Sequence, residues 1–428
     1  MDLYVGLVLA ASIFVASVIS VELGLSAAII EIALGVIVGN FLGVKQIEWV
    51  RYIAGFGGIL LTFMAGAEVD LGVMRAKARE SILIGIFSFA APFVGTLLFC
   101  QYLLGWNSSA AKLAGIALST TSLAVVYAVL VETGLTNTVI GKTIMASTFV
   151  TDFGTAAGLS LLFATPSTRT LWFAIISIGI IAIAPWTGPS FFRRYGGRVI
   201  EPEIKLVFLF LIVLMYFAHF GASHAILPAF VLGLVLSPIF HQNLELQRKL
   251  RVVAFAFITP IFFLNGGMNI SLPLLWINVG MFAALLATKL ITKFVGVYPL
   301  SKLYMPREAT YTTLLMSTGL TMGTISSLFG YERGIINQAQ FSVLVAVVVA
   351  SAIVPTFIAQ RFFHPHHAFV AMGNEIEPEL LAADRSRPEL FVANSIPKDT
   401  EGRRRKAEGG ENDGRNSTFL TADRINLL

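Results

Sequence analysis

The sequence predicts an all-α polytopic membrane protein with about thirteen transmembrane helices. Of its 428 residues, 56% are hydrophobic and only 13% are charged, whereas a soluble domain carries about 25% charged residues. The mean hydropathy is +0.79. Apolar runs of about 20 residues, the length that spans a bilayer, follow one another through residues 3–362. A transmembrane domain is therefore expected over residues 1–363.

Gly, Pro and charged residues divide the apolar stretch into separate spans. The first run has no basic segment before it and no small-residue cleavage site after it, so we expect a spanning helix and not a signal peptide. The single cysteine, Cys100, excludes a disulfide framework. The predicted spans are residues 3–21, 25–43, 52–69, 81–104, 110–133, 139–165, 170–188, 204–221, 224–240, 250–268, 272–299, 308–330 and 338–362.

Four alternate connections between spans are rich in Lys and Arg. These basic connections are residues 75–79, 193–198, 248–251 and 302–307, while the others hold scattered single charges. The positive-inside rule then places the N-terminus outside and the C-terminus in the cytoplasm, in the inner (or plasma) membrane. Because the basic residues flank apolar spans, the net charge of +5 does not indicate nucleic-acid binding.

The composition changes from about His364. Residues 364–428 hold nine Lys or Arg and eleven Asp or Glu, which is typical of a disordered segment. They contain no G-x-G-x-x-G motif and are too few for a nucleotide-binding domain. We expect a disordered cytoplasmic tail and no cofactor.

Two polar interruptions within the spans resemble each other. Ser119–Ser122 reads STTS and Ser317–Thr321 reads STGLT, and each is followed by a Glu shortly before a Gly. The two copies lie seven spans apart, so they enter the membrane from opposite sides. This pattern is typical of the inverted repeats of secondary transporters, in which broken helices line a site at mid-membrane.

One carboxylate lies in the middle of an apolar span. Asp152 follows Thr151 within the run from Val139 to Ala164. A charge at that depth costs roughly 2.5 to 3.5 kcal/mol on insertion scales, and such residues mark ion or proton pathways. Asp152 is therefore the first candidate for a functional residue.

Seven stretches within about residues 20–362 carry a recognisable order of motifs. They are AAIIEIALGVIVGNFLG, GGILLTFMAGAEVDLGVMR, STTSLAVVYAVLVETG, TD at residues 151–152, GASHAILPAFVLGLVLSP, TPIFFLNGGMNI and KFVG. In this order they resemble the motifs of the second family of monovalent cation:proton antiporters. The pattern is not followed everywhere: Ile30 replaces a Gly, Ala67 replaces a Leu, and Thr151 replaces the first acid of a pair.

The resemblance implies an inverted-repeat sodium/proton-antiporter fold with two broken crossing helices. A core of residues 81–165 and 272–362 would slide against a dimerisation scaffold of residues 3–69 and 204–268. The implied activity is exchange of Na⁺ or K⁺ for H⁺ by a homodimer in the lipid bilayer. An enzyme activity is not expected.

Asp152 is expected to bind a monovalent cation and a proton competitively. Such cations prefer oxygen ligands, and burial disfavours a bare carboxylate. Thr151 and the span 5 residues Thr121 and Ser122 are candidate further ligands. Glu31 and Thr318 are secondary candidates.

A lysine of span 11 is expected beside this site. In the family that lysine pairs with the first acid, which is Thr151 here. Lys293 fits the K-x-x-G spacing with Gly296, whereas Lys289 lies one turn deeper on the same face and remains a rival.

Other functions on the same fold stay open from the sequence. They are a cation channel, a sodium-coupled symporter and a membrane component without transport activity. A symporter would need a roomy cavity and a basic residue for an organic anion, and no Arg lies near the breaks. Neither the choice between Na⁺ and K⁺ nor the stoichiometry follows from the sequence.

Removal of residues 364–428 is expected to leave cation/proton exchange largely intact, because a segment of this composition offers no ligand-binding fold. The measurement is exchange in vesicles that contain the truncated protein, with membrane insertion checked in parallel. Loss of exchange in a well-inserted truncation would show that the tail takes part in transport.

Overall fold

The computed structural model describes residues 2–23, 26–44, 47–69, 72, 78–133, 135–136, 138–163, 167–221 and 223–363. These residues are almost wholly helical, and no β-strand occurs among them. The expected tail, residues 364–428, lies outside the described residues.

Each of the thirteen predicted spans falls on one helix or on two or three consecutive helical segments. In chain order the helices are α1 (Asp2–Leu23), α2 (Ala27–Asn40), α3 (Glu48–Ala67), α5 (Ala78–Leu98), η1 (Phe99–Leu103), α6 (Ser108–Ser119), α7 (Leu123–Glu132), α8 (Val139–Leu162), α9 (Thr168–Tyr195), α10 (Pro202–Phe220), α11 (Ile226–Gln242), α12 (Leu244–Val253), η2 (Ala254–Ile258), α13 (Thr259–Met268), α14 (Leu272–Ile277), α15 (Val279–Tyr304), α16 (Ala309–Met316), α17 (Thr321–Glu332) and α18 (Gln338–Phe362).

The described part of the chain contains nine helical segments that are long and apolar enough to cross a membrane. Two more, α2 and α11, are apolar but shorter. α8 carries Lys142 and Asp152 among its apolar residues, and α16 and α17 are separated by a break. The membrane-protein class is confirmed, while the number of thirteen crossings stays a prediction.

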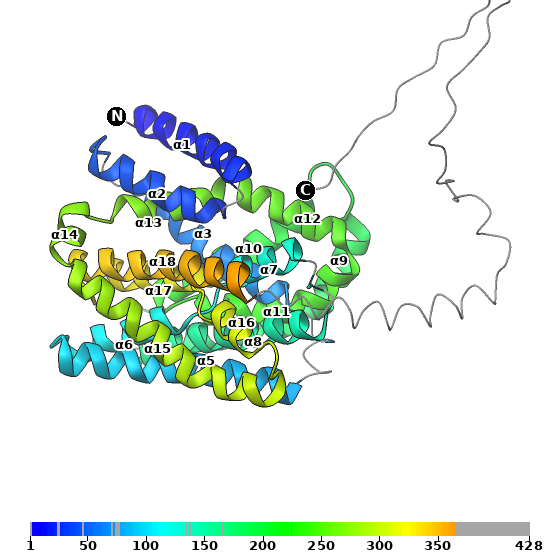
Figure 1. The fold of residues 1–428 in the computed structure, drawn as a ribbon. Coiled ribbons are helices and arrows are strands. Elements are labelled where there is room, and N and C mark those ends of the chain that lie inside the picture. The colour runs from blue at the N-terminus through cyan, green and yellow to red at the C-terminus, as the bar shows by residue number, and fades with distance from the viewer. Residues whose placement is uncertain are drawn as a thin grey trace, which may run out of the picture. The chain divides into compact units, whose positions relative to one another are not determined.

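The helices pack in two groups, which we call the crossing group and the flanking group. α5, α6, α8, α15, α16, α17 and α18 pack on one another, and α1, α2, α3, α9, α10, α11 and α13 form the second set. Most of the long helices run roughly along a common direction, with α15 and α5 side by side (Figure 1). The division into a sliding core and a dimerisation scaffold stays a prediction.

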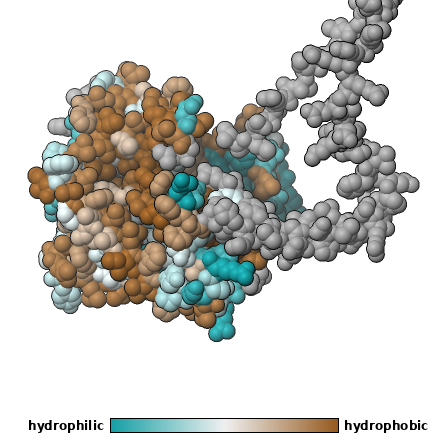
Figure 2. Space-filling model, viewed as in Figure 1, coloured by the Kyte–Doolittle hydropathy of each residue, from teal (hydrophilic) through white to brown (hydrophobic). Residues whose placement is uncertain are grey.

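The outer surface of the helices is apolar, as a lipid environment requires. Large side chains such as Phe14, Ile178, Trp186 and Val295 are exposed. Figure 2 shows hydrophobic residues over most of the visible face, with hydrophilic residues gathered mainly toward its right-hand and left-hand edges.

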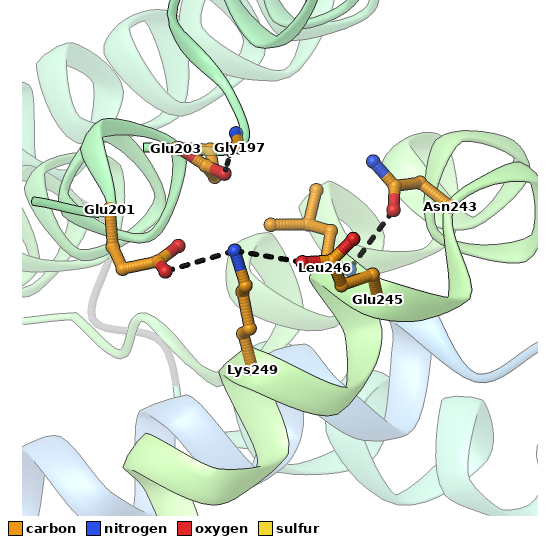
Figure 3. A network of polar contacts seen from close by, with 7 residues as sticks. All are labelled: Gly197, Glu201, Glu203, Asn243, Glu245, Leu246 and Lys249. Carbon is orange, nitrogen blue, oxygen red and sulfur yellow. Dashed lines mark hydrogen bonds and ion pairs between the residues drawn. The ribbon is translucent and has the colours of Figure 1, made fainter. Parts of the chain in front are cut away.

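One end of the helices is held by charged contacts around α12, and we call it the α12 end. Lys249 Nζ lies 2.9 Å from Glu201 Oε1 and 3.2 Å from Glu245 Oε1. Glu203 Oε1 accepts a hydrogen bond of 3.1 Å from the backbone N–H of Gly197. These contacts join the α9–α10 connection to α12 (Figure 3). Because these ion pairs are partly exposed and solvent screens them, they contribute little to stability.

α2 and α13 approach each other at reciprocal glycines. A Cβ on Gly35 would clash with the carbonyl oxygen of Leu264, and a Cβ on Gly267 would clash with that of Ile32. Small residues allow such close approach between membrane helices, where packing and not hydrophobic exclusion drives association. The two helices therefore behave as one unit of the flanking group.

Replacement of Gly267 by Val is expected to destabilise this unit, because the added side chain must push α2 and α13 apart. Overpacking of this kind costs about 1–3 kcal/mol, which should lower the midpoint of thermal unfolding in detergent. Gly179→Val in α9 is the matched control, since no atom lies within 4 Å of the Cβ position at Gly179. Equal midpoints for the two variants would contradict the reciprocal packing.

Candidate functional site

Both predicted interruptions are breaks in helices. Thr120 is extended (φ −65°, ψ 154°) between α6 and α7, and Leu320 (φ −140°, ψ −72°) precedes α17. Hydroxyls at the breaks bond nearby backbone: Ser119 Oγ donates to Ile116 O at 2.8 Å and Thr318 Oγ1 donates to Leu315 O at 2.8 Å. Ser and Thr offer the backbone such alternatives to helix continuation, so these sequences favour a break.

The two breaks contact each other directly. The backbone N–H of Ser122 donates to the carbonyl of Thr318 at 3.1 Å. The Thr121 hydroxyl donates to the carbonyl of Met316 at 2.9 Å. Groups freed from one broken helix are thus satisfied by the other, as irregular backbone at membrane depth requires.

Lys293 joins the breaks to α5. Its side chain is fully buried, and its Nζ donates to Ser88 Oγ at 2.8 Å and to Thr121 Oγ1 at 3.0 Å. No carboxylate of the described residues lies within ion-pair distance of it. The lysine therefore has two hydroxyl partners in place of the acidic partner of the family pattern.

Gly296 makes this contact possible. A Cβ at Gly296 would lie 2.5 Å from the carbonyl oxygen of Phe87 and 2.7 Å from the Ala91 Cβ. The missing side chain lets α15 cross close to α5, which brings Lys293 to Ser88. This packing explains the K-x-x-G spacing in physical terms.

Lys289 is also fully buried, but it lies elsewhere. Its Nζ has no hydrogen-bond partner among the described residues, and it faces the second break, where a Cβ on Gly319 would collide with it. The two lysines thus occupy different surroundings, and of the two it is Lys293 that bonds to α5 and to the first break.

Asp152 lies at the wall of a cavity in an otherwise buried setting. Its side chain is 3% exposed, and its Oδ1 has no hydrogen-bond partner among the described residues. The adjoining cavity has a volume of about 230 Å³ and is also lined by Thr121, Thr321 and Glu31. A buried carboxylate oxygen without a partner is costly, so this position favours a bound proton or cation.

The cavity carries a negative electrostatic character. Asp152, Glu31 and Glu68 line it, and none of its lining residues within the described chain is Lys or Arg. Glu68 lies at the α12 end, where Arg251 Nη2 donates to its Oε1 at 2.8 Å. The cavity therefore runs from Asp152 toward the α12 end.

A second cavity of about 220 Å³ lies toward the opposite ends of α3 and α17. It is lined by His219, His224, Glu332 and Arg333. Arg333 Nη2 lies 3.5 Å from His224 Nδ1, and His224 is in the connection between α10 and α11, outside both helices. Burial and the nearby Arg333 lower the pKa of His224 to about 4.

An apolar layer separates the two cavities. α3, α13 and α17 line both of them. Phe263 and Met322 face the first cavity, whereas Phe262 and Ile325 face the second. Met322 and Ile325 are three residues apart, about 4.5 Å along a helix, so the layer is thin.

The structure brings only part of the predicted set to the cavity. Asp152, Thr121 and Glu31 line it. Thr151 is buried and donates to the carbonyl of its own helix at Thr148, 2.7 Å away. Ser122 and Thr318 belong to the breaks and do not line the cavity.

Sequence reasoning missed Ser88. A signal was present, because Ser81, Ser88 and Thr96 recur at helical spacing along α5, and all three are buried. Buried polar residues on one face of an apolar helix indicate a polar partner on a neighbouring helix.

A family model described as “Sodium/hydrogen exchanger, transmembrane” matches residues 8–364. The chain is 27% identical over 359 residues to the probable Na(+)/H(+) antiporter 3 of Methanocaldococcus jannaschii, covering 80% of this chain and 90% of that protein. It is 24% identical over 356 residues to the Na(+)/H(+)-K(+) antiporter GerN of Bacillus cereus, covering 78% and 89%, respectively.

The solved structure of the sodium proton antiporter MjNhaP1 from Methanocaldococcus jannaschii at pH 8 has a similar fold. The TM-score is 0.60 at 13% sequence identity, and the likeness covers 83% of this chain and 95% of that one. At this identity the likeness concerns the fold alone. It confirms the expected antiporter fold, and together with the family match it confirms the resemblance found in the sequence motifs.

Proposed function

We infer that this chain, which belongs to the transmembrane sodium/hydrogen exchanger family, exchanges Na⁺ or K⁺ for H⁺ by alternating access, with Asp152 binding the two in competition. The homologues named as antiporters of Na⁺, K⁺ and H⁺ support the exchange itself. The observation that carries the role of Asp152 is its buried carboxylate, with one oxygen unpartnered, at the wall of an acidic cavity.

Competition follows from the surroundings of this carboxylate. A bare anion at this depth is unfavourable, and either a proton or a monovalent cation neutralises it. A cation would also take oxygen ligands from Thr121 and from the backbone at the breaks, which suits a hard ion. Occupation by one ligand displaces the other, and both leave the carboxylate neutral enough to cross.

Access would alternate across the apolar layer. In this conformation Asp152 belongs to the cavity at the α12 end, and the second cavity is closed off from it by Phe262, Phe263 and their neighbours. A shift of the crossing group along α3 and α13 by about one helical turn would carry Asp152 past this layer. By the basic-loop rule the α12 end is cytoplasmic.

Lys293 would hold the two broken helices in place where they meet. The C-terminal ends of α6 and α16 meet there, and helix C-termini carry partial negative charge that a nearby ammonium stabilises. Its bonds to Ser88 and Thr121 tie this charge to both α5 and the first break. Lys293 would then hold the broken helices while Asp152 exchanges its ligand.

The rival functions fit less well. Pockets for organic ligands are usually about 300–1,000 Å³, whereas this cavity has about 230 Å³ and no basic lining residue among the described ones. A symporter for organic anions is therefore disfavoured. A channel needs a continuous pore, and the apolar layer between the cavities opposes one.

The Asp152→Asn variant is expected to reduce exchange to the level of protein-free vesicles, because an amide supplies neither a titratable proton nor a countercharge. The measurement is the collapse of a preformed pH gradient after addition of Na⁺ or K⁺, with a panel of salts. Exchange at the wild-type rate in this variant would contradict the proposed role of Asp152 as the binding group for cation and proton.

Thr151→Val is the matched control for the variant above. Its hydroxyl donates to its own helix, and valine keeps the shape, so exchange should stay close to wild type. Thermal unfolding of both variants separates a transport defect from misfolding.

Exchange is expected to be electroneutral, with one cation for one proton. Thr151 replaces an acid, so the pair at residues 151–152 has one negative charge for its two ligands. A two-proton cycle needs a second group that releases a proton when the cation arrives, and Lys293 is the candidate. The experiment imposes a membrane potential on vesicles without an ion or pH gradient, and no coupled cation uptake should follow.

The opposite result has a defined signature. If the potential alone drives cation uptake with proton efflux, and Lys293→Gln abolishes that response, the exchange is electrogenic and Lys293 carries the second proton. Lys289→Gln tests the other buried lysine in the same assay.

A further inference from the structure

A large apolar groove lies away from the Asp152 cavity, between α2, α14, α15 and α18. Its volume is about 1010 Å³. Apart from Asn40 and Trp276, its walls are entirely apolar. They include Ile32, Val36, Leu275, Phe282, Val349 and Ile353.

Water is a poor occupant of this groove. One water needs roughly 10–15 Å³ of such space and two to four polar partners, and apolar cavities stay dry. The side-chain amide of Asn40 is already used: its Nδ2 donates to Ile270 O at 2.7 Å and its Oδ1 accepts from Leu272 N at 3.0 Å. A ligand that fits this groove must therefore be one that forms no hydrogen bonds.

The dimensions of the groove fit one leaflet of a bilayer. Its α2 wall extends from Ile29 to Phe41, which is about 18 Å at 1.5 Å per residue. Half of a hydrocarbon core of about 30 Å is about 15 Å. Trp276 (82% exposed) and Phe41 (72% exposed) lie at the same end as Asn40, as aromatic residues do at a membrane interface.

The walls come from both helix groups. α2 is held to α13 in the flanking group by the reciprocal glycines, whereas α15 and α18 belong to the crossing group. The short connection at Ser271, whose N–H donates to Ser342 Oγ at 2.9 Å, joins the groups at the rim. If the groups move as proposed above, a rigid partner that bridged both walls would oppose the motion, whereas a fluid chain adapts to it.

We propose that this groove binds an acyl chain of a bilayer lipid, which enters from the leaflet at the Asn40 end and fills the space between α2 and α18. The apolar walls, the depth of one leaflet and the lack of free polar groups specify a hydrocarbon chain. The head group would lie at the rim, beside Trp276.

The test uses a phosphatidylethanolamine with a photoreactive diazirine at the middle of one acyl chain. The full-length protein in detergent is given a small molar excess of this lipid, irradiated and mapped by peptide mass spectrometry. Peptides of α2 and α18 should be labelled roughly tenfold more than the α9 peptide around the exposed Ile178, a difference of about 1.4 kcal/mol in binding free energy.

Filling the groove should remove this labelling. Ala33→Phe projects from α2 and Ala350→Phe from α18, so each tests one wall. Ala11→Phe, on the exposed face of α1, makes the same enlargement outside the groove and should label as the wild type does. Thermal unfolding confirms that the variants remain folded.

Three results would overturn the proposal: α9 labelled as strongly as α18, labelling that persists in both groove-filling variants, or no labelling at all. A change from dimer to monomer in Ala33→Phe would assign the groove to a second copy of the chain instead. Asp152→Asn should label normally, so failure of lipid binding and failure of the transport proposal are distinguishable.

Discussion

A carboxylate buried at membrane depth without a complete set of partners is the constraint on which the rest of the structure depends. Asp152 can be kept there only if a proton or a cation reaches it, and the cavity toward the α12 end supplies the route. Glu31 on that route adds a second acidic side chain, and charges lining a low-dielectric cleft focus its field. The ion pair of Glu68 with Arg251 holds the Glu68 side chain at the α12 end of the cavity.

The same constraint explains the broken helices. A continuous helix would use its own carbonyls and offer no oxygen ligand beside Asp152, whereas a break exposes backbone and must be satisfied from elsewhere. Here Thr121 bonds Met316 and Ser122 bonds Thr318, so each break stabilises the other. Lys293 can enter this arrangement only because Gly296 lets its helix approach α5.

The fold class and both breaks could be predicted from the sequence, since apolar length and hydroxyl-rich interruptions are local signals. Asp152 stood out as a lone charge, and it is buried at the wall of a cavity, while its binding of ions stays a prediction. The K-x-x-G spacing favoured Lys293 over Lys289, but both lie on one helix face, and only the packing shows that Lys293 contacts Ser88. The side-chain direction of Thr151 was equally hidden, since its hydroxyl has a partner on its own helix.

His219 and His224 line the second cavity, but His224 is a poor pH sensor. Burial and Arg333 lower its pKa to about 4, so the ring is neutral above that pH and its charge does not change between pH 6 and 8. Protonation would place a second positive charge beside Arg333, which the surroundings disfavour. A pH dependence of exchange in the neutral range would then come from proton competition at Asp152 and not from this histidine. The two kinds of pH dependence can be told apart by the cation concentration. Inhibition of exchange by protons that compete at the binding site decreases when the cation concentration is raised, whereas inhibition by a histidine switch does not.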